Sequence, residues 1–165
     1  MNRAYISIGS NIEKRSNVRA ALRWLDKLST VVAVSSVYET TPVGCRYLES
    51  FFNAAIVLET PHSPGQLKRS LLNVIESRLG RTRGSDKNAP RTIDLDISLF
   101  NESIITMGHR RIPDPDLVRF AHIAIPLAEI ASCYIYPTTG EPLAEIAVRL
   151  KVAGGIKIRR DIPLL

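Results

Sequence analysis

The chain has 165 residues, of which 45% are hydrophobic and 23% charged, and this composition suits one compact globular domain spanning residues 1–165. Its two cysteines are too few for a disulfide scaffold, and no apolar stretch approaches the ~20 residues that cross a bilayer, so we expect a cytoplasmic protein that does not span a membrane. The excess of 22 Lys and Arg over 16 Asp and Glu suits a polyanionic ligand, which could be a nucleotide, a nucleic acid or a membrane surface.

The first half of the chain alternates between strand-like and helix-like patterns. A strand near residues 4–9 leads into a helix that Ser16 can cap, and this helix carries an apolar stripe at helical spacing. Two β-rich segments follow, Val31 to Glu39 and Phe52 to Thr60, and the loop between them is long enough to carry binding residues. The pattern therefore predicts a strand, a helix and two further strands.

A strong start signal predicts a second helix. The segment Ser63-Pro64-Gly65-Gln66 supplies a cap, a proline at the first helical position and the glutamine of a capping box, and Gly80 ends the helix. Near its C-terminal end the helix dipole opposes the charge of Glu76, and the pattern alone favours a surface glutamate beside neighbouring arginines. The stripe expected to be buried is Leu67, Leu71, Val74, Ile75 and Leu79.

A basic segment and an acidic strand come next. Residues 80–91 contain glycines and no hydrophobic periodicity, which predicts a mobile loop with four cations, Arg81, Arg83, Lys87 and Arg91. On the strand that follows, side chains alternate between faces, so Asp94 and Asp96 share a face with Thr92 and Ser98. The opposite face is expected to pack Ile93, Leu95, Ile97 and Leu99.

The two acids on one face require an explanation. Like charges about 7 Å apart on a half-buried strand persist where cations compensate them. Two carboxylates at this spacing suit Mg²⁺, which keeps several waters and completes its coordination with phosphate oxygens. Together with the basic loop they suit phosphoryl transfer. The plain alternative is a solvated sheet face beside a surface loop, and a nucleic-acid phosphate is another possible ligand of that loop.

The remaining segments complete a fold prediction. We expect a short segment at residues 103–106 and helices around residues 116–131 and 142–150. The order strand, helix, strand, strand, helix, strand predicts an α+β fold, a ferredoxin-like sandwich whose antiparallel sheet has helices packed mainly on one face and the other face open. Residues 151–165 have the pattern of an irregular basic tail, and the sequence assigns no role to it.

Several separated segments carry a specific resemblance. The stretch Ala89-Pro90-Arg91-Thr92-Ile93-Asp94-Leu95-Asp96-Ile97 resembles the signature of the 6-hydroxymethyl-7,8-dihydropterin pyrophosphokinases of folate biosynthesis. Four further segments resemble that family in order and spacing: Tyr5 to Asn11, Ser35 to Gly44, Phe52 to Ala55 and Pro126 to Ile130. The resemblance covers about residues 4–150, and several motifs in order are far more specific than any one of them.

This resemblance implies a reaction and a nucleotide site. The family transfers the β,γ-diphosphoryl group of ATP to the hydroxymethyl oxygen of the dihydropterin and releases AMP. By resemblance, Asp94 and Asp96 hold two Mg²⁺ ions, Arg81 and Arg91 assist catalysis, and the basic loop closes as a lid that excludes water. The residues implied to bind ATP are Glu76, Arg81, Arg83, Lys87, Arg91, Ile97 and Arg119.

The resemblance also implies a pterin site. Asn53 offers donors and acceptors to the edge of the ring, and Phe51 stacks on its face where the family often has tyrosine. His122 is a hypothetical second stacking residue, although a lone histidine is more often structural. Two further departures are Asn88, which replaces a large lid residue, and Arg119, which replaces a family arginine from one position earlier. The implied pterin-binding set is Thr40, Thr41, Pro42, Val43, Gly44, Phe51, Asn53 and His122.

Two alternatives stay open from the sequence. A ferredoxin-like domain with a basic surface can bind RNA, although Asp94 and Asp96 would repel phosphate unless a metal intervened. A catalytically inactive relative would keep only the fold and its ligand binding. We expect the enzyme, acting as a monomer on ATP and the dihydropterin with no nucleic-acid or membrane partner, and Mg²⁺ dependence would separate it from an RNA-binding module.

Overall fold

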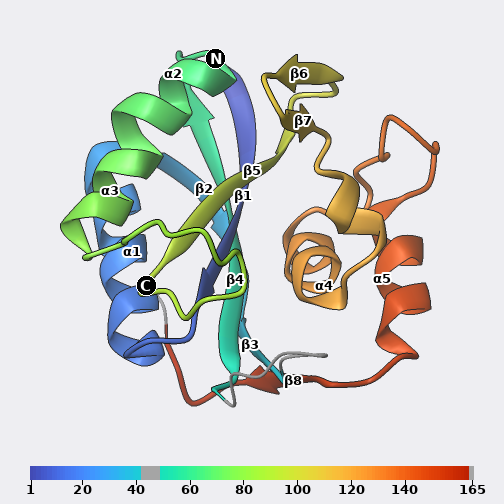
Figure 1. Ribbon diagram of the computed structural model, residues 1–165. Helices are drawn as coiled ribbons and strands as arrows, with labels where there is room; N and C mark the ends of the chain where they lie inside the picture. The colour runs from blue at the N-terminus through green and yellow to red at the C-terminus, as the bar shows by residue number, and fades with distance from the viewer. Residues whose placement is uncertain (42–48, 164–165) are drawn as a thin grey trace.

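The computed structural model describes residues 1–41 and 49–163, and most of its strands form one antiparallel sheet (Figure 1). The strand order is β5-β1-β4-β3-β8, and β2 also pairs with β4. The bounds are β1 Asn2–Ser10, β2 Thr30–Val34, β3 Val37–Thr40, β4 Phe51–Thr60, β5 Asp94–Phe100 and β8 Ile156–Arg159. The predicted antiparallel, ferredoxin-like architecture is therefore confirmed.

The segment predicted as one strand from Val31 to Glu39 is divided into β2 and β3, which pair with successive parts of β4. Ser35 lies at the break and is buried. Its N–H donates to the carbonyl of Ala55 (2.9 Å), and its hydroxyl accepts from the Ala55 N–H (2.8 Å). A side-chain hydroxyl thus replaces a backbone acceptor, so the ladder is interrupted without leaving a buried donor unpaired.

Helices on the first face of the sheet bury the larger hydrophobic core. The helix α1 begins at Lys14, so the predicted cap at Ser16 is wrong; Glu13 occupies the cap position with left-handed backbone (φ 41°). The predicted stripe is buried against Ile6 and neighbouring strand residues at Val18, Ala21, Leu22 and Leu25, but its last predicted member, Leu28, is 47% exposed. The helical segments on this face are α1 Lys14–Leu28, α2 Pro64–Leu67, the π-helical turn η1 Lys68–Leu72 and α3 Asn73–Arg78.

The segments α2, η1 and α3 form one helical rod whose π-helical turn the sequence did not predict. The capping box is confirmed, because the Ser63 N–H donates to Gln66 Oε1 (2.9 Å) and the Gln66 N–H donates to the Ser63 hydroxyl (3.4 Å). A π-helical turn contains more residues than an α-helical one and so rotates every later position around the axis. As a result Leu72 and Glu76 are buried, whereas Val74, predicted to be buried, is 37% exposed.

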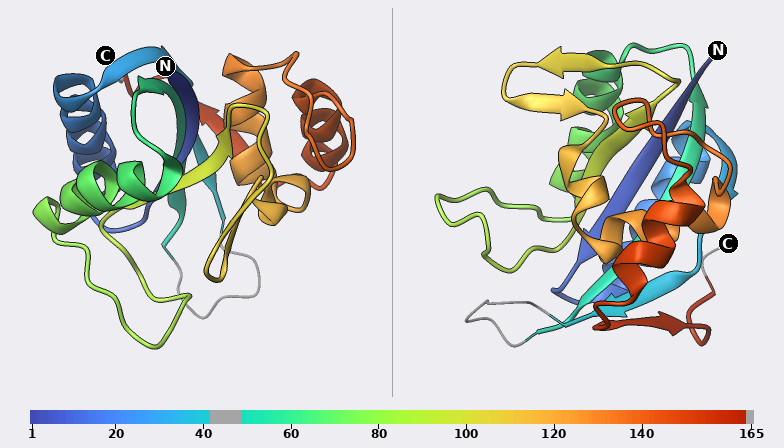
Figure 2. Two further views of the ribbon diagram at one scale, coloured as in Figure 1. Left: turned by 90° about the horizontal axis from the view of Figure 1, so that it is seen from above. Right: turned by 90° about the vertical axis from the view of Figure 1, so that its right-hand side faces the viewer.

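The second face of the sheet is also covered, which corrects the prediction of an open face (Figures 1 and 2). The helices α4 Ala121–Ile130 and α5 Leu143–Lys151 lie there, and the predicted helix at 116–131 is divided into the 3₁₀ turn η2 Pro115–Val118 and α4. Both faces of β4 are apolar, as expected for a strand buried on two sides. The second core contains Tyr5, Ala55, Val57, Leu99, Leu117, Ala124, Leu127, Tyr136, Leu143 and Ile146.

A β-bulge in β5 changes which face its later side chains occupy. Tyr5 pairs with Leu99 and Ile6 pairs with Ile97, so Ser98 is an extra residue between them. Its buried hydroxyl forms a hydrogen bond with that of Ser7. Leu99 therefore packs in the second core, and the prediction that it shares a face with Ile97 is wrong.

Two further strand pairs were absent from the prediction. Beyond β5, the strands β6 Ile105–Met107 and β7 Arg110–Ile112 form a separate hairpin. Near the C-terminus, β8 pairs with β3, so the prediction of an irregular tail at residues 151–165 is wrong. Its position is reached through Gly154 and Gly155, both at positive φ, which reverse the chain after α5. No helix in the described part of the chain has the length and hydropathy needed to cross a membrane.

Candidate active site

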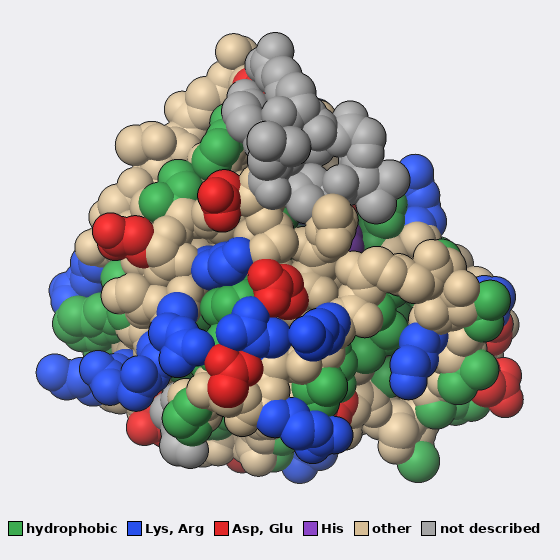
Figure 3. Space-filling model, turned by 90° about the horizontal axis from the view of Figure 1, so that it is seen from below, with side chains coloured by type: hydrophobic (Ala, Val, Ile, Leu, Met, Phe, Trp, Pro, Cys, Tyr) green, Lys and Arg blue, Asp and Glu red, His purple; other side chains and the backbone are tan. Residues whose placement is uncertain are grey.

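A cavity of about 700 Å³ collects most of the residues predicted to form the site. Its walls come from β1, the end of β3, the start of β4, the segment before β5, the start of β5, the region of η2, the start of α4 and the segment after α5. Lysine and arginine side chains gather around a few acidic ones on the face of the molecule that includes this region (Figure 3). The predicted residues that line the cavity are Thr40, Thr41, Phe51, Asn53, Lys87, Arg91, Asp94, Asp96, Arg119 and His122.

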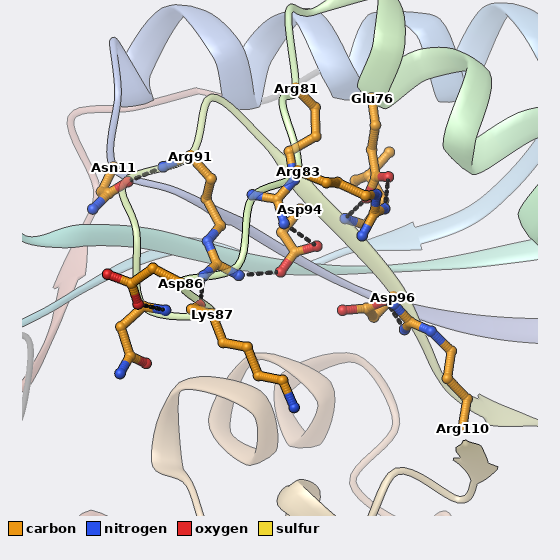
Figure 4. Close-up of polar contacts among 12 residues, drawn as sticks. Asn11, Glu76, Arg81, Arg83, Asp86, Lys87, Arg91, Asp94, Asp96 and Arg110 are labelled. Atoms are coloured by element: carbon orange, nitrogen blue, oxygen red, sulfur yellow. Dashed lines mark hydrogen bonds and ion pairs between the residues drawn. The ribbon is translucent and has the colours of Figure 1, made fainter.

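Asp94 lies at the start of β5 and contacts two arginines (Figure 4). Arg91 Nη1 donates to Asp94 Oδ2 (2.9 Å), and Arg81 Nη2 lies 3.8 Å from Asp94 Oδ1. The Nε atoms of both arginines are buried without a hydrogen-bond partner in the structure. Each guanidinium thus has one donor that no group of the described residues satisfies.

Asp96 is held by cations that the sequence did not identify. Lys68 Nζ from η1 lies 3.2 Å from Asp96 Oδ1, and Arg110 from β7 binds the same oxygen. Burial opposes ionisation of the carboxyl group, but Lys68 and Arg110 outweigh it and hold the pKa of Asp96 below its usual range. A second cavity of about 300 Å³ adjoins this carboxylate, and Ile97 lines that cavity and not the larger one.

Glu76 is buried, which corrects the pattern-based expectation of a surface glutamate. Its Oε1 accepts from the Leu95 N–H (2.8 Å) and lies 3.4 Å from Lys68 Nζ, and its Oε2 lies 2.6 Å from Arg83 Nη2. Among the described residues, Glu76, Arg81 and Arg83 line neither of the two cavities. Through Lys68 and Leu95, Glu76 instead braces the strand that carries the two aspartates.

The loop before β5 is fixed at its end by Arg91. The Arg91 N–H donates to Asn11 Oδ1 (2.7 Å), its carbonyl accepts from the Asn11 N–H (3.1 Å), and its guanidinium binds the Lys87 carbonyl. Lys87 extends from this loop toward α4 (Figure 4). Asn88, at the position where a larger lid residue was expected, also lines the cavity.

The opposite part of the cavity is less charged. Asn53 is 3% exposed and its Nδ2 donates to Thr40 Oγ1 (2.8 Å), which orients the amide. Phe51 lines the cavity nearby, whereas the predicted contacts from Pro42, Val43 and Gly44 lie outside the described residues.

Aromatic side chains at the start of α4 form another wall. The rings of Phe120 and His122 lie 5.5 Å apart between centroids, and burial lowers the pKa of His122, which favours its neutral form. Arg119 lies over the Phe120 ring and pairs with Asp116 at 3.2 Å, largely exposed to solvent. Sequence reasoning therefore assigned this wall correctly to the cavity but missed Phe120 and Asp116.

Other lining residues escaped prediction because only the fold brings them to the site. Asp114 lies between the two cavities, and burial raises its pKa. Arg110 and Lys68 reach Asp96 from a hairpin and a π-helical turn, neither of which has a sequence signal. Residues 153–156 enter the cavity wall because β8 pairs with β3.

The two carboxylates of the cavity suit a metal ion whose remaining ligands come from waters and a bound phosphate. Asp94 and Asp96 offer carboxylate oxygens to one cavity, but no group of three or more His, Cys, Asp or Glu in the described part of the chain is arranged to hold a metal. Mg²⁺ is commonly bound by one or two carboxylates with waters and substrate phosphates supplying the remaining oxygens. The residues present therefore fit Mg²⁺ that arrives with a phosphate ligand.

Comparisons with known proteins agree on one family. A model described as 7,8-dihydro-6-hydroxymethylpterin-pyrophosphokinase (HPPK) matches residues 5–132. The chain is 41% identical over 132 residues to the 2-amino-4-hydroxy-6-hydroxymethyldihydropteridine pyrophosphokinase of Bacillus subtilis, covering 78% of each chain. It is 34% identical over 134 residues to the Pseudomonas aeruginosa protein of the same description, covering 79% of this chain and 82% of that one.

Solved structures support the fold. The wild-type HPPK-DHPS of Plasmodium falciparum with pteroate superposes with a TM-score of 0.75 at 13% identity, covering 95% of this chain and 45% of that one. An HPPK-DHPS in complex with substrates gives a TM-score of 0.74 at 14% identity, covering 95% of this chain and 46% of that one. The chain thus spans about half the length of these solved chains.

Proposed function

The chain belongs to the 7,8-dihydro-6-hydroxymethylpterin-pyrophosphokinase family of folate biosynthesis, and we propose that its larger cavity carries out the family's reaction. In this reaction the β,γ-diphosphoryl group of ATP is transferred to the hydroxymethyl oxygen of 6-hydroxymethyl-7,8-dihydropterin, and AMP leaves. The observation that carries the proposal is the pair Asp94 and Asp96 in one cavity, with Arg91 and Lys87 in its wall.

Asp94 and Asp96 would hold Mg²⁺, and we propose two ions. When bound, Mg²⁺ would offset the negative charge that develops on the phosphate oxygens. The arginine and lysine partners of the two aspartates already neutralise them in the free protein. The same cations lie beside the carboxylates and would be available to bind the phosphates of ATP.

The cations would clamp the triphosphate. Arg91 and Lys87 line the cavity, and Arg81 contacts Asp94 from behind it, so all three lie within reach of a ligand bound at that carboxylate. Bidentate arginine contacts fix phosphate geometry, and exclusion of water by the loop would limit wasteful hydrolysis of ATP. Glu76 would act by holding Arg83 and the backbone of Leu95, while Ile97 and Arg119 would complete the nucleotide site.

The less charged part of the cavity suits the pterin. Asn53 is buried and pre-oriented by Thr40, so its amide can pair with the edge of the aminopyrimidinone ring at little entropic cost. Phe51 and the neutral ring of His122 offer flat surfaces for stacking. Thr41, Pro42, Val43 and Gly44 would complete the contact to the ring through backbone groups.

We also propose that residues 1–165 act as one domain and as a monomer in the cytoplasm. Both hydrophobic cores share one sheet, and most of the described residues assigned above gather around one cavity. A nucleic-acid-binding module is not favoured, because the family match identifies a pyrophosphokinase. Sedimentation of the purified chain with and without ATP would check the monomer.

The decisive experiment measures AMP release from ATP with Mg²⁺ and the dihydropterin. Asp94→Asn and Asp96→Asn keep side-chain size but remove the charge, and we expect each to lower the rate by about a hundredfold or more, by loss of the charge stabilisation that metals provide. Asp26→Asn, an exposed position on α1, is the matched control and should keep full activity. Pterin-independent AMP release, or full activity of both cavity variants, would contradict the proposal.

A further inference from the structure

We propose that the C-terminal segment, residues 153–159, forms part of the pterin-binding wall of the cavity. We further propose that Glu39 holds this segment in place through Arg159 on the opposite face of the sheet, and we call this Glu39–Arg159 contact the latch. The inference rests on the proposed pterin site and adds residues that lie beyond the part of the chain matched by the family model, which ends at residue 132.

A continuous chain of contacts links this segment to the pterin-facing amide. Ala153, Gly154, Gly155 and Ile156 all line the cavity. Ile156 pairs with Thr40 across the β3–β8 ladder, and the Gly155 carbonyl accepts from the N–H of the residue after Thr40 (3.3 Å). Thr40 Oγ1 in turn accepts from Asn53 Nδ2 (2.8 Å). Because β8 fixes the position of Thr40, it also sets the orientation of the Asn53 amide.

The latch lies on the other face, because strand side chains alternate. Glu39, the neighbour of Thr40, points away from the cavity lining and accepts from Arg159 Nη1 through Oε2 (2.5 Å). Its Oε1 accepts from the Ser50 hydroxyl (2.6 Å) and lies 3.4 Å from Lys14 Nζ. One carboxylate therefore joins α1, β3, the residue before β4 and β8.

Two further observations strengthen the latch. Arg159 and Lys14 both lie over the Phe52 ring, at 5.2 and 4.8 Å from its centroid, so the charged side chains also pack. The hydrogen bond from Ser50, followed by the contacts from Arg159 and Lys14, lowers the pKa of Glu39 to about 2, so the carboxylate is fully charged at neutral pH. Glu39 and Arg159 are thus positioning residues, since neither lines the cavity.

The test compares Glu39→Gln and Arg159→Met with Arg160→Met, which removes an exposed cation from the next position. Dihydropterin and ATP dissociation constants are measured separately by titration, and folding is checked by thermal unfolding. We expect each latch variant to weaken dihydropterin binding about tenfold, with ATP binding within twofold of the unaltered chain, a shift equivalent to about 1.4 kcal/mol for the pterin alone. Arg159→Lys should recover most of the affinity, and Arg160→Met should lose none.

The Glu39→Gln, Arg159→Met double variant should lose less dihydropterin affinity than the two single losses added together, because both changes break the Glu39–Arg159 contact. Each change also removes contacts of its own, with Ser50 and Lys14 for Glu39 and with Asp161 for Arg159. Unchanged dihydropterin affinity in folded latch variants would overturn the inference, as would an equal loss of ATP affinity, which would indicate general distortion. If the unaltered chain bound neither ligand, the proposed function itself would fail, an outcome distinct from a failure confined to the latch variants.

Discussion

At the scale of single residues, Glu76 is a carboxylate with 2% exposure and three donors on its two oxygens. Removing it takes away the acceptor of the Leu95 N–H, whereas Lys68 keeps Asp96 as a partner. We expect Glu76→Ala to lower the free energy of unfolding by about 1–3 kcal/mol, because a buried donor is left without an acceptor. Urea denaturation would measure the change.

Two variants serve as controls for Glu76→Ala: Glu76→Gln at the same position, and Glu145→Ala at an exposed glutamate. The amide oxygen introduced by Glu76→Gln can still accept from the Leu95 N–H, so this change should cost less than Glu76→Ala. Glu145 is exposed on α5, and its replacement should cost less than about 1 kcal/mol. Equal effects of Glu76→Ala and Glu145→Ala would contradict the assigned bracing role.

At the scale of elements, Gly80 controls how the rod of α2, η1 and α3 passes into the basic loop. It has φ +76°, and an added Cβ would meet no atom within 4 Å, so backbone strain alone limits substitution. The next N–H, of Arg81, donates to the Glu76 carbonyl (2.9 Å). Gly80→Ala should therefore lower the free energy of unfolding by about 1 kcal/mol and weaken ATP binding through Arg81.

Gly84 is the control within the same loop, since its φ is not in the positive range and a Cβ there also meets no atom within 4 Å. Gly84→Ala should leave the free energy of unfolding and the affinity for ATP unchanged. Chemical denaturation and ATP titration of the two variants provide the comparison, and a larger effect at Gly84 than at Gly80 would refute this account of the helix end.

The rod also shows what local patterns can and cannot predict. The capping box and the glycine stop are local signals, and both are confirmed. The π-helical turn has no such signal, so the stripe drawn through it assigned Val74 to the core in place of Leu72 and left Glu76 on the surface. Lys68, the first residue of that turn, reaches Asp96 through tertiary packing that no local pattern predicts.

At the scale of the whole molecule, lysine and arginine side chains gather around a few acidic ones on the face that includes the proposed ATP site (Figure 3). Screening weakens attraction between partly exposed charges at higher ionic strength. We expect ATP affinity to fall several-fold between low and high NaCl concentration, whereas affinity for the uncharged dihydropterin should stay constant. Parallel titrations of the two ligands check this, and an equal decline for both would contradict separate charged and neutral halves of the cavity.

The predicted site residues came from the acidic strand, the basic loop before it and the family resemblance of several separated segments. Those that the structure describes largely meet in one cavity, with Glu76, Arg81, Arg83 and Ile97 outside its lining. What the sequence did not predict depends on long-range pairing. The unbroken apolar run of β4 was a signal of burial on both faces, yet nothing local identified α4 and α5 as its cover. The pairing of β8 with β3 likewise joins segments that lie far apart in the sequence.

The β-bulge at Ser98, which places Leu99 in the second core, has a further consequence for β5. Because Ser98 is one extra residue on β5, the side chains after it point to the face opposite to the one that strict alternation from the start of the strand would give. The direction of the two aspartate side chains is thus set by the part of β5 before the bulge, and that of Leu99 by the part after it. The pairing of the distal half of β5 with β1 is therefore set separately from the pairing of the half that carries the acids.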